Sequence, residues 1–225
     1  KLVEFVRDQH IILERYDGYF IKDRPYVDKI VMRIIKDPAA RALGRKNGEI
    51  LLSTFESTPQ DINHSKQISY LTATDQGYAA IGPITWLAFN TKSKPTSDKR
   101  VRQAIAFAVD RNFLVNAVMM GTSKPAYTGF HPGSVFNDPN VERYDLDVDK
   151  ANAILDEAGY ARGSDGMRFK LNIDFGWPAA RSMAEYVKPQ LKKIGIDVTV
   201  RQSPDFPSWA KRISTWEFDM TVDVV

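Results

Sequence analysis

The residue types that most often carry catalysis are thinly spread along this chain. Its three histidines, His10, His64 and His131, lie far apart and do not form the HExxH spacing of a zinc hydrolase. The carboxylates Asp156 and Glu157 are adjacent on a predicted helix, where neighbouring side chains point in different directions. The absence of cysteine removes thiolate catalysis, disulfides and cysteine-based zinc sites together. The sequence therefore predicts no catalytic residue, no metal site and no resident cofactor.

Motifs for phosphate, nucleophilic or nucleic-acid chemistry are also missing. The glycines Gly159, Gly163 and Gly166 fit a helix stop and a turn, not a strand-to-helix phosphate cradle. No Gly-x-Ser-x-Gly nucleophile elbow occurs. The net charge is +3, and basic pairs such as Lys192–Lys193 fall on predicted helices without forming a stripe. We therefore expect neither an enzyme nor a nucleic-acid-binding protein.

Aromatic and basic side chains offer better material for binding a ligand. Trp177 follows the end of a predicted strand at Phe175 and precedes a helix that we expect to start near Pro178. Clefts in α/β domains form at the carboxyl ends of such strands. Arg181 lies one helical turn beyond Trp177 and is a candidate for holding an anionic group. Trp177 and Arg181 are therefore candidate ligand-binding residues.

The elements that must position these residues change in character near Pro95. Before it the chain is β-rich, with Asp37 and Pro38 providing the cap and first residue of one helix. The predicted strands are 1–6, 10–15, 29–35, 49–54 and 85–90, and the predicted helix is 39–47.

After Pro95, helices alternate with strands, which indicates helices packed on a sheet. Ser97 or Asp98 should cap the first of these helices, and Gly159 should end the second in a left-handed conformation. A loop covers 122–140, the predicted helices are 98–121, 147–158 and 178–194, and the predicted strands are 168–175, 197–201 and 218–225.

The sequence shows no membrane span and no signal peptide. Lys1–Val6 and Phe218–Val225 alternate polar and apolar residues as strands do, whereas chain ends are usually loose and polar. We therefore expect a fold that is incomplete at both ends.

Several segments, in order along the chain, resemble one known family. Residues 90–110 read N-T-K-S-K-P-T-S-D-K-R-V-R-Q-A-I-A-F-A-V-D. This segment resembles the oligopeptide-, dipeptide- and nickel-binding receptors of bacterial ABC importers, the extracellular solute-binding family 5. Further matches are Gly121 with Pro125-Ala126, Tyr144 to Tyr160, Ile194 to Val198, Leu13 to Phe20, and Gly48 to Ile50. Two positions depart from the family pattern, Leu51 for an Asp and Phe20 for a Trp.

The resemblance implies an α/β fold of the periplasmic-binding-protein type (type II, cluster C), with two lobes around a cleft. Residues 1–93 would form part of lobe I, including a crossover strand, and residues 94–225 most of lobe II. The lobes would close on the ligand, with a hinge expected at 92–95 because Pro95 fixes the geometry between two differently patterned halves.

The resemblance also implies ligand-binding residues. Trp86 falls where peptide-binding members place an aromatic facing the cleft, and Arg212 at a position that meets the ligand's carboxylate. Phe206 shares the segment of Arg212, before the last strand. Thr54 and Phe55 end the predicted strand 49–54 at a position that faces the cleft in relatives.

The function implied is the substrate-binding component of an ABC importer. It would be a periplasmic monomer that captures a peptide-like solute and delivers it to a membrane permease. Three alternatives stay open: a periplasmic chaperone or ligand-sensing adaptor on the same fold, a receptor for a nickel chelate, opine or sugar, and a hydrolase.

Overall fold

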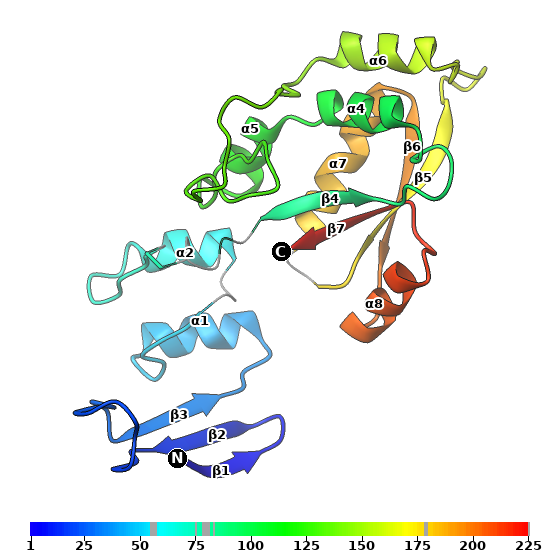
Figure 1. Cartoon of the computed structure of the whole chain (residues 1–225). Helices are drawn as coiled ribbons and strands as arrows, with labels where there is room; N and C mark the ends of the chain where they lie inside the picture. The colour runs from blue at the N-terminus through cyan, green and yellow to red at the C-terminus, as the bar shows by residue number, and fades with distance from the viewer. Residues whose placement is uncertain (55–57, 75, 78–81, 83, 178–179, 225) are drawn as a thin grey trace. The chain divides into compact units, whose positions relative to one another are not determined.

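Figure 1 shows the chain as a computed structural model, which describes residues 1–54, 58–74, 76–77, 82, 84–177 and 180–224. The chain divides into two compact units, Lys1–Thr72 and Ala73–Val225. Each unit contains helices and strands, so the α/β class expected from the sequence is confirmed.

The first unit opens with a three-stranded antiparallel sheet. Its strands are β1 (Leu2–Val6), β2 (His10–Glu14) and β3 (Lys29–Arg33), and they lie in the order β1-β2-β3. Asp8, in the turn between β1 and β2, has φ 61°. Aspartate tolerates this left-handed conformation because its short polar side chain can bond locally. All three strands were predicted from their apolar patterns.

Two short helices complete the first unit. Helix α1 (Pro38–Lys46) begins as predicted, with the Ala40 amide donating to Asp37 Oδ1 at 2.7 Å. Helix α2 (Pro59–Ser65), which the sequence reading missed, begins at a capping box between Thr58 and Asp61.

The predicted strand 49–54 is wrong. The amides of Glu49 and Ile50 both donate to the Gly44 carbonyl, at 2.9 and 3.1 Å, so the chain turns back onto the end of α1. The Ile50 side chain packs so closely on Gly44 that a Cβ there would lie 2.8 Å from Ile50 Cδ1. Because these bonds draw the segment onto the helix, its apolar residues do not join a sheet.

The second unit is built on a four-stranded mixed sheet in the order β4-β7-β5-β6 (Figure 1). Strand β4 runs antiparallel to β7, while β7, β5 and β6 are mutually parallel. The strands are β4 (Thr85–Phe89), β5 (Phe169–Phe175), β6 (Ile196–Gln202) and β7 (Met220–Val224).

Helices α4 (Lys99–Ala108) and α7 (Arg181–Lys193) cover one face of this sheet, and α6 (Val148–Glu157) packs on α4. Alternate strand residues such as Ile173 and Met220 point into the core on this face. The core also contains Val101, Ile105, Phe107, Leu155, Leu171, Phe175, Ala184, Val187, Leu191, Ile196, Val198 and Val222.

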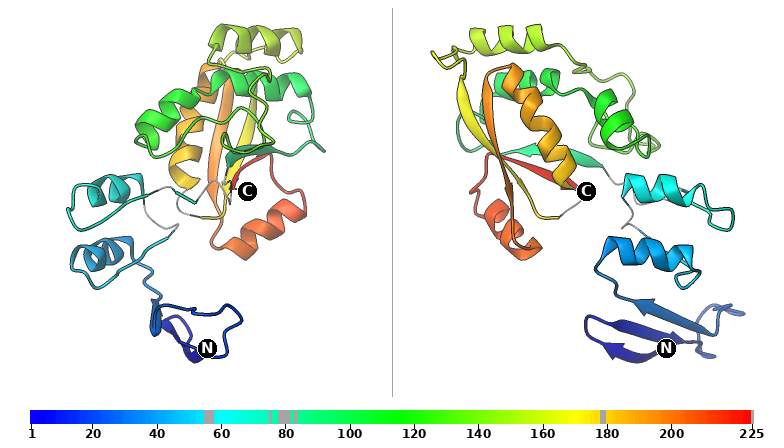
Figure 2. Two further views of the ribbon diagram at one scale, coloured as in Figure 1. Left: turned by 60° about the vertical axis from the view of Figure 1, so that its left-hand side comes forward. Right: turned by 180° about the vertical axis from the view of Figure 1, so that it is seen from behind.

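Helix α8 (Phe206–Ser214) covers the opposite face, as both views in Figure 2 show. Trp209 of this helix donates a hydrogen bond to Thr221, and Arg212 donates one to Asp174. Thr221 and Asp174 alternate along β7 and β5 with core residues, so their side chains point to the opposite face. The Ser208 amide donates to Asp205 Oδ1 at 2.7 Å and begins the helix. Hydrogen bonds from Ser208 hold the pKa of Asp205 below its usual range.

The helix predicted over 98–121 is broken. Helix α4 ends at Ala108, because Val109 is extended with φ −100° and ψ 113°. Asp110 then caps a new start, with the Phe113 amide donating to Asp110 Oδ1 at 2.9 Å. The chain continues through α5 (Arg111–Phe113) into a π-helix, η1 (Leu114–Val118). The break follows from the Asp110 side chain, which favours a helix cap over a helix interior.

The compact units divide at Thr72, whereas the sequence places the lobe boundary at 93 and 94. The difference concerns β4, which pairs with β7 in the second unit. The candidate hinge 92–95 lies inside this unit, where the Thr96 hydroxyl donates to the Asn90 carbonyl at 2.6 Å. The assignment of β4 to the first lobe, as a crossover strand, stays a prediction. Across the residues that the structure describes, no helix is long and apolar enough to span a membrane.

Candidate functional site

The connections that follow β5 and β6 leave the sheet on opposite faces. Strand β5 leads at its carboxyl end to α7 on one face, and β6 leads to α8 on the other face. Neighbouring parallel strands whose connections leave to opposite faces form a topological switch point, which is where open α/β sheets bind ligands. Trp177 follows β5, and Phe206 opens α8, so two predicted site residues lie at this point.

Trp209 joins these two residues into an aromatic cluster. Its ring centroid lies 5.3 Å from that of Trp177, edge to face at 81°, and 5.3 Å from that of Phe206 at 41°. Trp209 is only 6% exposed, while Phe206 is 60% exposed. The aromatic cluster, defined as Trp177, Phe206 and Trp209, therefore has a fixed inner ring and an outer ring open to solvent.

Trp209 is held by a close approach and a hydrogen bond. It lies directly over Gly176, where a Cβ would be 2.7 Å from its Cγ. Its indole Nε1 donates to Thr221 Oγ1 at 2.9 Å, and that hydroxyl donates to the Asp174 carbonyl at 2.9 Å. Because all of these groups are buried, the indole has one defined position.

Arg212 bonds to a buried carboxylate. It donates to Asp174 Oδ1 at 2.5 Å, and Arg201 makes a bidentate contact with the same carboxylate at 3.1 and 2.7 Å. The Asp174 side chain is fully buried, and that of Arg212 is 30% exposed. The predicted ligand-carboxylate anchor is thus paired within the protein.

Trp86 and Arg181 lie at the same edge of the sheet as the aromatic cluster. Because β4 is antiparallel to β7, its first residues meet the carboxyl end of β7, and Trp86 pairs with Asp223. Trp86 is 40% exposed and shares the sheet face of Asp223. Arg181 is the exposed first residue of α7, and Ala180 before it provides no side-chain cap.

The two remaining predicted residues belong to the first half of the chain. Thr54 is exposed and lies in the first compact unit, outside any strand. Phe55 lies outside the described residues. A cleft role for either residue stays a prediction.

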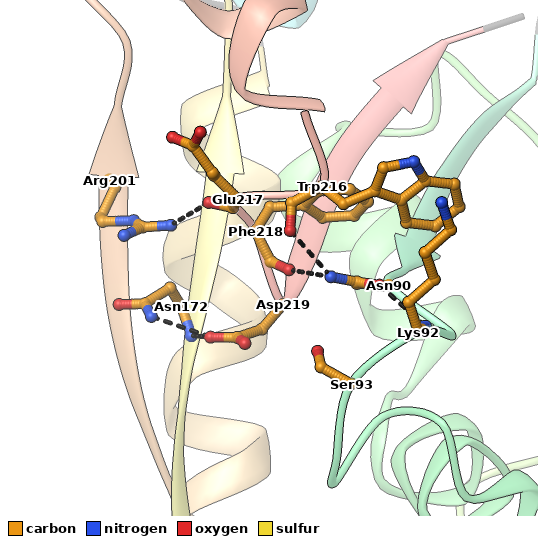
Figure 3. Close-up of a pocket in the computed structure, with 9 residues that line it drawn as sticks. All are labelled: Asn90, Lys92, Ser93, Asn172, Arg201, Trp216, Glu217, Phe218 and Asp219. Carbon is orange, nitrogen blue, oxygen red and sulfur yellow. Dashed lines mark hydrogen bonds between the residues drawn. The ribbon is translucent and has the colours of Figure 1, made fainter. Parts of the chain in front are cut away.

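Figure 3 shows a separate polar depression at the amino end of β7, beside the middle of β5, and its volume is about 270 Å³. Asn90 Nδ2 donates to the carbonyls of Trp216 and Phe218, at 3.0 and 2.8 Å. The backbone amide and the side-chain amide of Asn172 both donate to Asp219 Oδ2 at 2.8 Å. None of the predicted site residues lines this depression. Its other lining residues are Lys92, Ser93, Arg201 and Glu217.

The polar groups of this depression mainly hold its own loops together. Trp216 adopts φ 63°, and Lys92 Nζ lies 3.9 Å from the centroid of its ring. Among the residues that the structure describes, no cluster of three or more histidines and carboxylates is suited to a metal. The carboxyl edge, with the exposed rings of Phe206 and Trp86, is therefore the better candidate for a ligand site.

Open α/β sheets bind ligands at such a switch point, and this one carries the aromatic cluster. Comparison with known proteins identifies the family of this chain. The sequence profile of the bacterial extracellular solute-binding proteins, family 5 (middle), matches residues 1–224. The chain belongs to this family, so the resemblance seen in the sequence is confirmed.

Individual relatives agree with this assignment. The chain is 30% identical to the oligopeptide-binding protein AppA of Bacillus subtilis over 240 residues, covering 99% of this chain and 42% of that protein. It matches the structure of NikA from Brucella suis in complex with Fe(III)-EDTA with a TM-score of 0.82, at 28% identity, covering 100% of this chain and 47% of that one. It matches the periplasmic binding protein DppA from Helicobacter pylori in complex with the peptide STSA with a TM-score of 0.81, at 25% identity, covering 100% and 42%.

The chain spans between 37% and 42% of the length of the first curated relatives that it matches. The solved structures that it matches confirm the periplasmic-binding-protein fold. Members of this family bind solutes for transport and act outside the cytoplasm.

Proposed function

We propose that the full-length protein is the substrate-binding component of an ABC importer, and that it captures a peptide-like solute in the periplasm. The aromatic cluster at the switch point of the sheet is the observation that carries this proposal. Trp177 and Phe206, together with Trp86 at the same edge, offer flat apolar surfaces. Such rings pack on apolar side chains and stack on peptide planes.

The start of α7 suits the charged end of a peptide. Ala180, the residue before α7, provides no side-chain cap, and Arg181 adds a positive charge at the same point. A helix amino terminus and a guanidinium both favour a carboxylate. With Arg212 bonded to Asp174, Arg181 is our candidate for the ligand's carboxylate.

The names of relatives favour peptides over other solutes. They include a dipeptide-binding protein of Escherichia coli and an AppA structure from Bacillus subtilis in complex with a nonapeptide. Nickel-binding and heme-binding relatives also occur, so a metal chelate is the second candidate.

We propose that a monomer closes two lobes over the ligand and then docks on a membrane permease, without catalysis. Residues 1–93 would supply part of the first lobe, with Thr54 and Phe55 facing the ligand, and 94–225 most of the second.

Native mass spectrometry of the full-length protein, purified without denaturation, tests this function. We expect a ladder of short peptides to be released from the protein. A single sugar or metal chelate would contradict the peptide assignment. Turnover of an added peptide mixture would contradict the absence of catalysis. A gene without a neighbouring permease and ATPase would favour a chaperone or ligand-sensing adaptor.

A further inference from the structure

One buried carboxylate links the far end of α8 to the aromatic cluster. The Asp174 side chain accepts hydrogen bonds from Arg201 on β6 and from Arg212 on α8. Its backbone carbonyl accepts from Thr221, whose hydroxyl in turn accepts from the Trp209 indole. A single residue therefore holds α8 at two points, one directly and one through Thr221.

These contacts argue against Arg212 as the anchor of the ligand's carboxylate. A ligand carboxylate that took the Nη1 donor of Arg212 would displace Asp174, whose side chain has no exposed surface and would lose one of its two guanidinium partners. Arg212 also lies six residues beyond Phe206, about 9 Å along the axis of α8 at 1.5 Å per residue. Its contact with Asp174, the residue before the end of β5, holds Arg212 on the sheet face that α8 covers.

The positions along α8 separate two tasks. Phe206 and Trp209, in the first half, contact one another, and Trp209 contacts Trp177. Arg212, in the second half, contacts Asp174. The second half thus anchors the helix, and the first half carries the rings that meet Trp177.

We propose that Asp174 is a positioning residue of the ligand site. By holding Arg212 and Trp209, it keeps the aromatic cluster in place to receive an apolar or aromatic side chain of the ligand, and it removes Arg212 from recognition of the ligand's carboxylate. This inference rests on the proposed function for its ligand and on the geometry of α8 for its mechanism.

Two peptide probes separate anchoring from positioning. The probes are the tripeptide Ala-Phe-Ala and its C-terminal amide, titrated against the full-length protein. We expect Arg212→Met to weaken both probes by the same factor, within about twofold. A ligand anchor behaves differently, because losing a charge-assisted hydrogen bond would weaken the acid by about tenfold or more and spare the amide. That result would overturn the proposal.

Matched variants control for general damage. Lys211→Met removes a positive charge from the exposed neighbour of Arg212 and should change neither titration. Arg212→Lys keeps a charge for Asp174 and should recover part of the loss for both probes. If Arg212→Lys instead rescued binding of the acid alone, a direct role of Arg212 in carboxylate binding would be established.

A readout without ligand tests the positioning step by itself. Trp177 and Trp209, at 5.3 Å and 81°, should give a near-ultraviolet circular dichroism band that Trp177→Phe removes. We expect Asp174→Asn and Arg212→Met to reduce this band, whereas Lys211→Met leaves it unchanged. An unchanged band in Asp174→Asn and Arg212→Met would refute positioning. If the wild-type protein bound neither probe, the peptide assignment would fail, while the band would still decide the role of Asp174.

Discussion

Replacing Gly176 by alanine tests how tightly the aromatic cluster is packed. Gly176 does not have positive φ, so an alanine there meets only a steric problem. Its Cβ would lie 2.7 Å from Trp209 Cγ and 2.9 Å from Trp209 Cβ and Cδ2. Carbon atoms pack best at about 3.5–4.0 Å, so the Trp209 ring has to move by about 1 Å.

The cost of that movement follows from the contacts of Trp209. Overpacking a buried site costs about 1–3 kcal/mol. Displacing the indole also weakens its 2.9 Å hydrogen bond to Thr221, which contributes about 1 kcal/mol. The lower entropy of alanine in the unfolded chain offsets about 0.4–1 kcal/mol. We expect the free energy of unfolding to fall by about 2 kcal/mol.

Urea denaturation followed by tryptophan fluorescence measures this change as a shift of the midpoint at constant slope. Gly129→Ala is the matched control, because a Cβ at Gly129 meets nothing within 4 Å and its φ is not positive. That variant should stay within about 0.5 kcal/mol of the wild type. Equal stability of the Gly176 and Gly129 variants would refute the close packing of Trp209.

Three further predictions concern hydrogen bonds. Thr221→Val leaves the buried Trp209 indole without its acceptor, and we expect urea denaturation to show a loss of about 1–3 kcal/mol in the free energy of unfolding. Thr221→Ser keeps the hydroxyl and should lose less. Equal losses in the two variants would contradict the role of the hydroxyl. Asn90→Ala removes the two hydrogen bonds that the side-chain amide donates to the carbonyls of Trp216 and Phe218, and it should lower the free energy of unfolding by about 2 kcal/mol. An unchanged free energy of unfolding would contradict a stabilising role of these bonds. The hydrogen bond from Arg168 lowers the pKa of Asp156 from its usual value of 3.8. The ionised carboxylate therefore stabilises the fold, and Asp156→Asn should lower the free energy of unfolding by its whole amount above pH 3.8. This loss should vanish as the pH falls through the lowered pKa. If the difference in the free energy of unfolding between the wild type and Asp156→Asn did not change with pH, the link between this hydrogen bond and the pKa of Asp156 would be excluded.

Local signals in the sequence predicted much of the fold. Asp37 caps its helix as expected, and Asp98 is one of the two caps expected for α4, because a cap depends on residues only two or three positions apart. Helix α2 was missed although Thr58 and Asp61 form a capping box. Asp110 likewise carries a cap signal that the long apolar pattern of 98–121 concealed.

The candidate site was less predictable because its contacts join distant segments. The strand end before Trp177 indicated a crevice residue, and the structure places it against Trp209. The pairing of Arg212 with Asp174 depends on the register of β5 and on the path of α8 over the sheet. A one-residue shift in register would turn Asp174 to the other face, so no local pattern fixes this contact.

The central place of β7 affects how the second unit is assembled during synthesis. Strand β7 lies between β4 and β5, so Thr85 pairs with Val224 near the far end of the chain. A nascent chain therefore carries β4 without its partner until Met220–Val224 has been made, and closing such a long loop is slow. Slow closure keeps the sheet of the second unit unformed for longer after synthesis, with the apolar face of β4 uncovered in the meantime.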